Sequence, residues 1–225
     1  MEIKKFLLNF ALVFTIMSCA NAPDKETGEI RVLQTLKQAW QNSSKSRLFI
    51  DSRTLLSRKY IDEVNTPILF VELESGQNGT LTPYPGKGVG QTWLAADGAT
   101  VTLERGILMA SRGMGDDVMG SNSVMPSWYE VNKNIKSYSR EISHITGNNK
   151  IFRRVFKCRM QKISKKEIIE IWGVDFFVTK FQENCNHNGF EIENVFYLDK
   201  QNIVRKSLQY HSDTIGYITL ERLDR

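Results

Sequence analysis

From Pro67 to the C-terminus, short apolar runs alternate with turn-forming dipeptides, and this alternation constrains the fold more than any other feature of the chain. The turns Asp97-Gly98 and Arg105-Gly106 separate runs rich in β-branched and aromatic residues, a pattern typical of β-hairpins. The runs lie at 68–73, 92–95, 100–103, 107–110, 130–145, 150–162, 168–171, 175–183, 191–198, 203–210 and 216–223. About ten strands joined by local turns predict a mainly β fold: an antiparallel multi-stranded sheet, a sandwich or a barrel-like single domain.

Two segments before Pro67 have helical rather than β periodicity. In 29–41, apolar residues recur on one helical face, and polar residues occupy the opposite face. A weaker candidate covers 52–64 and is stopped by Asn65-Thr66-Pro67. We therefore expect one or two N-terminal helices within a single mostly-β domain that spans residues 29–225.

The chain begins with a targeting sequence. Lys4 and Lys5 precede an apolar stretch of twelve residues, 6–17, which as a helix would reach about 18 Å, short of the roughly 30 Å hydrocarbon layer. Ser18-Cys19 then has the form of a lipobox, which predicts a lipoprotein signal peptide over 1–18, lipidation of Cys19 and a polar tether over 19–28. The alternative is an ordinary secretory signal with an incidental cysteine.

Three cysteines are an odd number for an exported protein, and lipidation of Cys19 leaves Cys158 and Cys185 as one pair. In an extended strand Cys158 shares a face with Phe156, and Cys185 shares one with Phe181, so both cysteines point to an apolar side. We predict a disulfide between them; two buried free thiols are the alternative.

The charge distribution argues weakly for an anionic partner. The formal net charge is +5, and residues 150–166 hold eight basic residues and no acid. On a strand, Arg153, Lys157 and Arg159 share a face that could attract an anionic polysaccharide or lipid phosphates. A solvated outer face is the alternative. Nucleic acid is disfavoured because no aromatic residue interleaves with these cations on the same face of the strand.

The segment Arg112-Gly113-Met114-Gly115-Asp116-Asp117 is the candidate recognition loop. Its paired carboxylates could serve acid–base chemistry or cap a short helix at Val118-Met119, and we expect Arg112 to pair with Asp116 or Asp117. The three histidines have no metal-ligand spacing, and the chain has no Gly-x-Ser-x-Gly nucleophile elbow. The sequence thus predicts no catalytic residue, metal site or cofactor.

The residues from Met109 to Met119 (MASRGMGDDVM) resemble the TRGLGDDLM segment of the YjbF-type, group 4 capsule lipoproteins. The Trp93-x-x-x-Asp97-Gly98 lead-in, the segments around Cys158 and Cys185, and 194–199, 205–210 and 216–217 follow in the family's order. Tyr210 stands where the family usually has Trp, and Ser111 where it has Thr. The resemblance covers residue 30 to the end, together with the lipobox.

The resemblance implies an outer-membrane lipoprotein encoded with capsule or exopolysaccharide genes, a mostly β fold and a paired Cys158 and Cys185. It implies no catalytic residue. We therefore expect a non-enzymatic accessory of capsule or exopolysaccharide assembly or export, anchored by lipid at the periplasmic face of the outer membrane, with anionic polysaccharide and other export proteins as partners. A polysaccharide-modifying enzyme that uses Asp116 or Asp117 and a scaffold for an outer-membrane β-barrel partner are the alternatives.

Overall fold

The computed structural model describes residues 51–86, 88, 90–123, 125–145 and 150–225. The expected signal peptide, Cys19, the tether and the helix expected over 29–41 lie outside the described residues. Among the helices that are described, none is long and apolar enough to cross a membrane.

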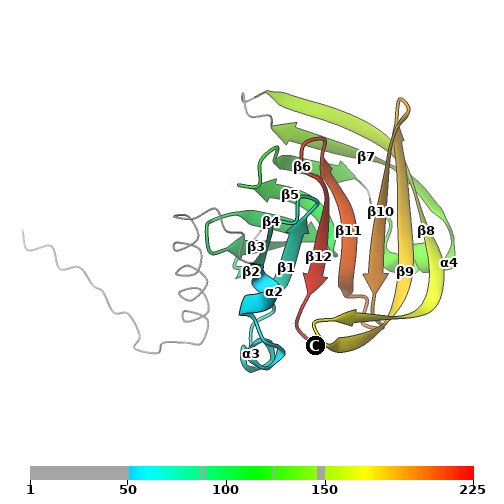
Figure 1. Cartoon of the computed structure of the whole chain (residues 1–225). Helices are drawn as coiled ribbons and strands as arrows, with labels where there is room; N and C mark the ends of the chain where they lie inside the picture. Colours follow the sequence, from blue (N-terminus) through cyan, green and yellow to red (C-terminus); the bar gives the residue numbers. More distant parts are fainter. Residues whose placement is uncertain (1–50, 87, 89, 124, 146–149) are drawn as a thin grey trace, which may run out of the picture.

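In this described part of the chain, twelve antiparallel strands form one sheet (Figure 1), which confirms the predicted mainly β fold. In chain order they are β1 (Leu69–Leu73), β2 (Asn78–Tyr84), β3 (Gln91–Ala95), β4 (Thr100–Glu104), β5 (Ile107–Arg112), β6 (Val118–Ser123), β7 (Lys136–Ile145), β8 (Ile151–Ile171), β9 (Val174–His187), β10 (Phe190–Leu198), β11 (Val204–Ser212) and β12 (Gly216–Arg222). Their spatial order is β5-β4-β3-β2-β1-β12-β11-β10-β9-β8-β7-β6.

The sheet curls until its two edge strands, β5 and β6, lie beside each other, so that it forms a nearly closed barrel (Figure 1). Alternate side chains of the strands point inward and build the main core, which includes Leu69, Trp93, Phe156 and Ile218. The strand directions give the barrel two distinct ends. We call the end with the segment 112–117 and the β11–β12 turn at 213–215 the loop end. We call the end with the turns at 105–106 and 199–203 the pocket end.

Two short helices cover the outer face of β1. The expected helix over 52–64 is divided into α2 (Ser52–Leu55) and α3 (Arg58–Glu63), because Ser57 caps the second helix by accepting a hydrogen bond from the Tyr60 backbone N–H. Phe70 of β1 points outward into this second core, where Leu56 and Ile61 cover it. Both faces of β1 are therefore buried.

The structure corrects two expected strand boundaries. The runs at 150–162 and 168–171 belong to one strand of 21 residues, β8, because irregular pairing with β9 between Lys162 and Glu167 absorbs the polar residues between them. The run at 130–145 begins instead as helix α4 (Trp128–Lys133). Ser127 and Glu130 form a capping box at its start, and Trp128 packs on Phe181 and Phe196.

Candidate functional site

The predicted disulfide between Cys158 and Cys185 is present. The two cysteines are direct cross-strand partners on β8 and β9, and both are buried in the main core, as the strand parity indicated. Their sulfur atoms lie within 4.8 Å of a carboxylate oxygen of Glu183, the one grouping of metal-ligating atoms in the described part of the chain. Disulfide sulfurs are not thiolate ligands, and Glu183 is already hydrogen-bonded, so this grouping does not form a metal site.

Glu183 belongs to a buried polar network that closes the barrel. Its carboxylate accepts hydrogen bonds from Arg140, Asn194 and Tyr138. Burial, and then the negative charge of Glu183, raise the pKa of the Tyr138 hydroxyl. The Arg140 guanidinium also donates to the Leu108 carbonyl of β5 and to the Ser121 hydroxyl of β6. One buried arginine thus bridges the two edge strands where no backbone ladder joins them.

The segment 112–117 lies at the loop end, where Asp117 organises its backbone. The Asp117 carboxylate accepts hydrogen bonds from the backbone N–H groups of Gly113 (2.8 Å) and Met114 (3.1 Å) and from the Ser111 hydroxyl (3.2 Å). Asp116 accepts one from the Thr214 hydroxyl of the β11–β12 turn. These carboxylates hold two turns together, which is a structural role for both.

The expected pairing of Arg112 with Asp116 or Asp117 is wrong. The Arg112 guanidinium instead donates to the backbone carbonyls of Ser111, Val118 and Met119. The expected helix at Val118-Met119 is also wrong, because Val118 begins strand β6. Both corrections have one cause. The edge strands β5 and β6 lie side by side without a backbone ladder, and we call this junction the seam. Carbonyl groups at the seam lack a backbone donor from the neighbouring strand, and the Arg112 side chain donates to them instead.

Ser111 lies beside a histidine and an aspartate but lacks the geometry of a hydrolytic triad. Its hydroxyl oxygen is 2.8 Å from His211 Nε2 and accepts the Val118 backbone N–H at 2.9 Å. A triad needs a carboxylate at the second imidazole nitrogen, yet His211 Nδ1 has no partner in the described part of the chain, and Asp117 contacts the serine. Ser111 is also 1% exposed. The cluster therefore fixes the loop end and offers no accessible nucleophile.

Burial and ion pairing each shift a pKa at the loop end. Desolvation, and then the nearby His144, lower the pKa of His211 to about 4, against an opposing effect of Asp117 and Asp116. His144 Nε2 lies 2.6 Å from the His211 carbonyl oxygen. At the rim, Arg154 forms a bidentate pair with Asp213 and lowers the pKa of that carboxyl to about 2.

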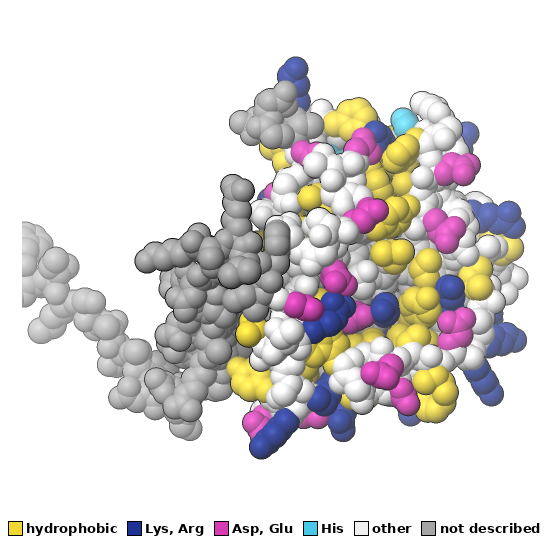
Figure 2. All heavy atoms as spheres, viewed as in Figure 1, with side chains coloured by type: hydrophobic (Ala, Val, Ile, Leu, Met, Phe, Trp, Pro, Cys, Tyr) yellow, Lys and Arg dark blue, Asp and Glu magenta, His cyan; other side chains and the backbone are white. Residues whose placement is uncertain are grey.

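The predicted basic face lies on the outside of β8. Arg153, Lys157 and Arg159 are all exposed, and Phe156, Cys158 and Met160 alternate with them on the inside. Arg153 pairs with Glu141 of β7, whereas Lys157 and Arg159 have no hydrogen-bond or ion-pair partner in the described part of the chain. Figure 2 shows several Lys and Arg side chains along the margin of the molecule where β8 and β9 lie.

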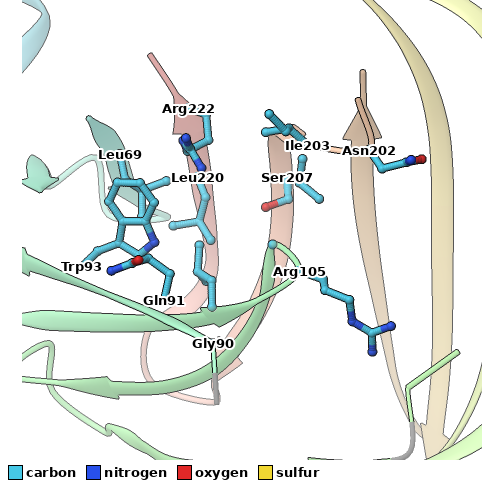
Figure 3. A pocket seen from close by; sticks show the side chains of 13 residues that line it. Leu69, Gly90, Gln91, Trp93, Arg105, Asn202, Ile203, Ser207, Leu220 and Arg222 are labelled. Carbon is cyan, nitrogen blue, oxygen red and sulfur yellow. The ribbon is translucent and has the colours of Figure 1, made fainter. Parts of the chain in front are cut away.

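A pocket of about 260 Å³ opens at the pocket end. Its floor is apolar and includes Leu69, Leu103 and Leu220, and exposed Gln91 and Asn202 lie at its rim. Trp93 lies in its wall with the Arg222 guanidinium 4.8 Å from its ring centroid, as Figure 3 shows. None of these residues was predicted as a site, and Trp93 in particular lies in a segment, 92–95, with the pattern of an ordinary core strand.

Comparison with known proteins finds a matching family and a solved structure with a similar fold. A family model described as "Group 4 capsule polysaccharide lipoprotein gfcB, YjbF" matches residues 33–223. The crystal structure of the hypothetical lipoprotein YmcC from Escherichia coli (K12) superposes with a TM-score of 0.70 at 14% sequence identity, covering 91% of this chain and 98% of that one. A search of the curated proteins finds no significant match.

Proposed function

Because the chain belongs to the group 4 capsule polysaccharide lipoprotein family, we propose that it is a lipid-anchored, non-catalytic accessory protein of capsule or exopolysaccharide assembly or export. In this proposal the protein holds acidic stretches of the polymer while other proteins build or move it. The basic face on β8 is the observation that carries the proposal.

The basic face has the composition of a glycan-binding surface. Across the sheet, Arg159 lies between Ser137 and Asn184, and Lys157 lies between Ser139 and Asn186. Each unpaired cation is therefore flanked by a hydroxyl and an amide, which hydrogen-bond sugar hydroxyls while the cation attracts a sugar acid. Arg153 to Arg159 spans about 20 Å along the strand, enough for several sugar units rather than one.

The contacts at the loop end argue against catalysis by its two carboxylates. Asp116 and Asp117, the candidate residues for an enzyme, are both engaged with the surrounding turns. A general acid or base must reach a substrate proton, and hydrogen bonds to the protein's own backbone occupy the Asp117 carboxylate. We keep the enzyme only as the weaker alternative.

A scaffold role has one observation in its favour. Ile168 of β8 and Phe177 of β9 are direct cross-strand partners, and their exposed fractions are 61% and 74%. An outward apolar pair of this kind suits contact with another protein. Photo-crosslinking from position 177 in living cells tests this role: crosslinks to an outer-membrane protein would support it, and crosslinks to lipid alone would contradict it.

The lipid anchor is part of the proposal. Lipidation of Cys19 after removal of residues 1–18 would hold the barrel at the periplasmic face of the outer membrane. Metabolic labelling with a radioactive fatty acid should mark the wild-type chain and leave Cys19→Ser unlabelled. Equal labelling of both chains would contradict the anchor.

The basic face is tested by complementing a deletion strain. The triple variant Arg153→Gln, Lys157→Gln, Arg159→Gln should fold normally yet restore much less surface polysaccharide than the wild type. A matched triple variant of exposed lysines outside β8, Lys59→Gln, Lys133→Gln and Lys200→Gln, removes the same charge and should restore it fully. Full restoration by the first triple variant, or equal loss in both, would contradict a role for this face.

A further inference from the structure

The pocket end contains a buried hydrogen-bond donor without an acceptor. The Trp93 side chain is 2% exposed, and its indole Nε1 has no hydrogen-bond partner among the described residues. Figure 3 shows this nitrogen on the side of the ring that faces the pocket, near Gln91 and Leu220. Burying a donor without an acceptor is unfavourable, so a ligand that brings an acceptor oxygen into the pocket removes this cost on binding.

Two glycines set the shape of the pocket. Gly90 and Gly106 both have a positive φ, and a Cβ on either would lie too close to its neighbours: 2.6 Å from the Leu103 carbonyl oxygen and 2.3 Å from the Val204 side chain. Gln209 adds a further tie, because its side chain donates to the Gly106 carbonyl and accepts the Leu108 N–H across the barrel. The walls are therefore held in place before any ligand arrives.

The polar groups of the pocket favour an uncharged ligand rich in hydroxyls. Arg222, the cation beside Trp93, is already neutralised by a bidentate pair with Asp224 at 2.7 and 2.8 Å. Arg105, the other cation of the lining, points away from Trp93 and donates to the Met125 carbonyl (Figure 3).

The Gln91 amide nitrogen already donates to the Tyr84 and Thr92 carbonyls, so Gln91 offers the pocket its acceptor oxygen. What remains is the Trp93 indole N–H and this amide oxygen beside an aliphatic floor. A sugar ring offers a hydroxyl oxygen to the indole, a hydroxyl proton to the amide oxygen and its C–H face to the leucines, whereas an acyl chain would leave the Trp93 N–H without a partner.

We propose that this pocket binds a single uncharged sugar residue of a glycan. The choice of a glycan as the source rests on the proposed function, but the site is separate from the basic face. The basic face would hold an extended acidic stretch of polymer, whereas the pocket, given its size, would take one ring, such as a chain end or a branch. Trp93 Nε1 would donate to a ring hydroxyl, and Gln91 and Asn202 would line the opening.

Calorimetric titration tests the pocket directly. The probes are short oligosaccharides released by mild hydrolysis from the host's own surface polysaccharide and, separately, dodecanoate. The full-length protein is used in lipid nanodiscs. Trp93→Phe removes the N–H and keeps an aromatic ring, so it should weaken oligosaccharide binding about tenfold, the effect of one buried hydrogen bond. Its melting temperature should stay within a few degrees of the wild type.

Trp172→Phe is the matched control, because Trp172 Nε1 also has no partner in the part of the chain that the structure describes. Trp172 lies at the β8–β9 turn and does not line this pocket. It should bind oligosaccharide as the wild type does. Absence of oligosaccharide binding, equal weakening in both variants, or dodecanoate binding that depends on Trp93 would each overturn the proposal. The triple variant of the basic face should retain this binding, so failure of the pocket and failure of the proposed function give different results.

Discussion

The two ends of the barrel use polar residues in opposite ways. At the loop end, Asp117, Asp116 and Arg112 are each hydrogen-bonded to a turn or to a strand edge. At the pocket end, the buried Trp93 N–H has no partner among the described residues and lies in the wall of a pocket with an apolar floor. His211 Nδ1 at the loop end also lacks a partner there, but His211 does not line this pocket. The charged residues of the segment 112–117 are therefore bound by the protein itself, whereas the Trp93 donor lies where a ligand can reach.

This difference shows why charge density in a sequence is a poor guide to a binding site. A cluster of charged residues on a turn predicts function only if the fold leaves those residues free. Here the barrel does not close through a backbone ladder between β5 and β6, and the charged side chains at the seam supply the missing hydrogen bonds. At the pocket end Gln209 supplies similar bonds to Gly106 and Leu108, but the Trp93 donor takes no part in them and remains available to a ligand.

The largest effect is expected from breaking the seam itself. Arg140→Ala would leave the Glu183 carboxylate buried without its cation and the Leu108 carbonyl without a donor, at a cost of about 3–5 kcal/mol in unfolding free energy. Urea denaturation measures it. Arg153→Ala, which breaks an exposed pair on the same barrel, should cost far less. Similar losses in the two variants would show that the seam does not depend on Arg140.

The disulfide should stabilise both ends alike, because Cys158 and Cys185 cross-link β8 to β9 at a position between the two ends of the barrel. Replacing both cysteines with alanine should lower the unfolding free energy by about 3–4 kcal/mol, since the cross-link of residues 27 apart restricts the unfolded chain. Thiol alkylation of the unreduced, denatured wild type should give no label at either position. Stoichiometric labelling there would contradict the bond.

Acid should weaken the loop end selectively. The pKa of His211 is about 4 in the folded protein and near 6.5 when unfolded, so the unfolded chain takes up the proton first. The contribution of His211 to the unfolding free energy is therefore fully present above pH 6.5. It is lost as the pH falls toward 4, by about 3 kcal/mol in total. His211→Gln should flatten this part of the urea-derived pH profile. An unchanged slope in His211→Gln would contradict the assignment.

A smaller loss is expected from Asp117→Ala. Removing the carboxylate deletes acceptors for two backbone N–H groups and the Ser111 hydroxyl, which should cost about 2 kcal/mol. Asp97→Ala removes a single bond of the same kind, to the Ala99 N–H in an exposed turn, and should cost less. Polysaccharide export should survive Asp117→Ala if the protein stays folded. Loss of export from a stably folded variant would return the recognition role to this loop.

Much of the fold could be predicted from the sequence because strand parity is local. The alternation around Cys158 and Cys185 indicated two buried cysteines, and Asp97-Gly98 and Arg105-Gly106 marked real hairpins. The partners at the two ends could not be predicted, because they come from distant parts of the chain. His211 contacts Ser111 across 100 residues, and the Val204 side chain lies against Gly106 only because the barrel curls.

The interpretation of Trp93 depends on the same distant contacts. Its neighbours 92–95 have an ordinary strand pattern, and only the assembled barrel shows that its indole nitrogen lies in a pocket without an acceptor. Conversely, the loop at 112–117 looked functional because its glycines and charges are poorly explained by core packing. The edge strands supplied the missing explanation.

The central claim is that the pocket end binds a ligand while the loop end is structural, and a two-dimensional ¹H–¹⁵N NMR titration tests both halves at once. On addition of host-derived oligosaccharide, the indole N–H signal of Trp93 should move downfield as it gains an acceptor. The backbone amides of Gly113 and Met114, which are already bound to Asp117, should not move. A shift confined to Gly113 and Met114, with the Trp93 signal unchanged, would contradict the account.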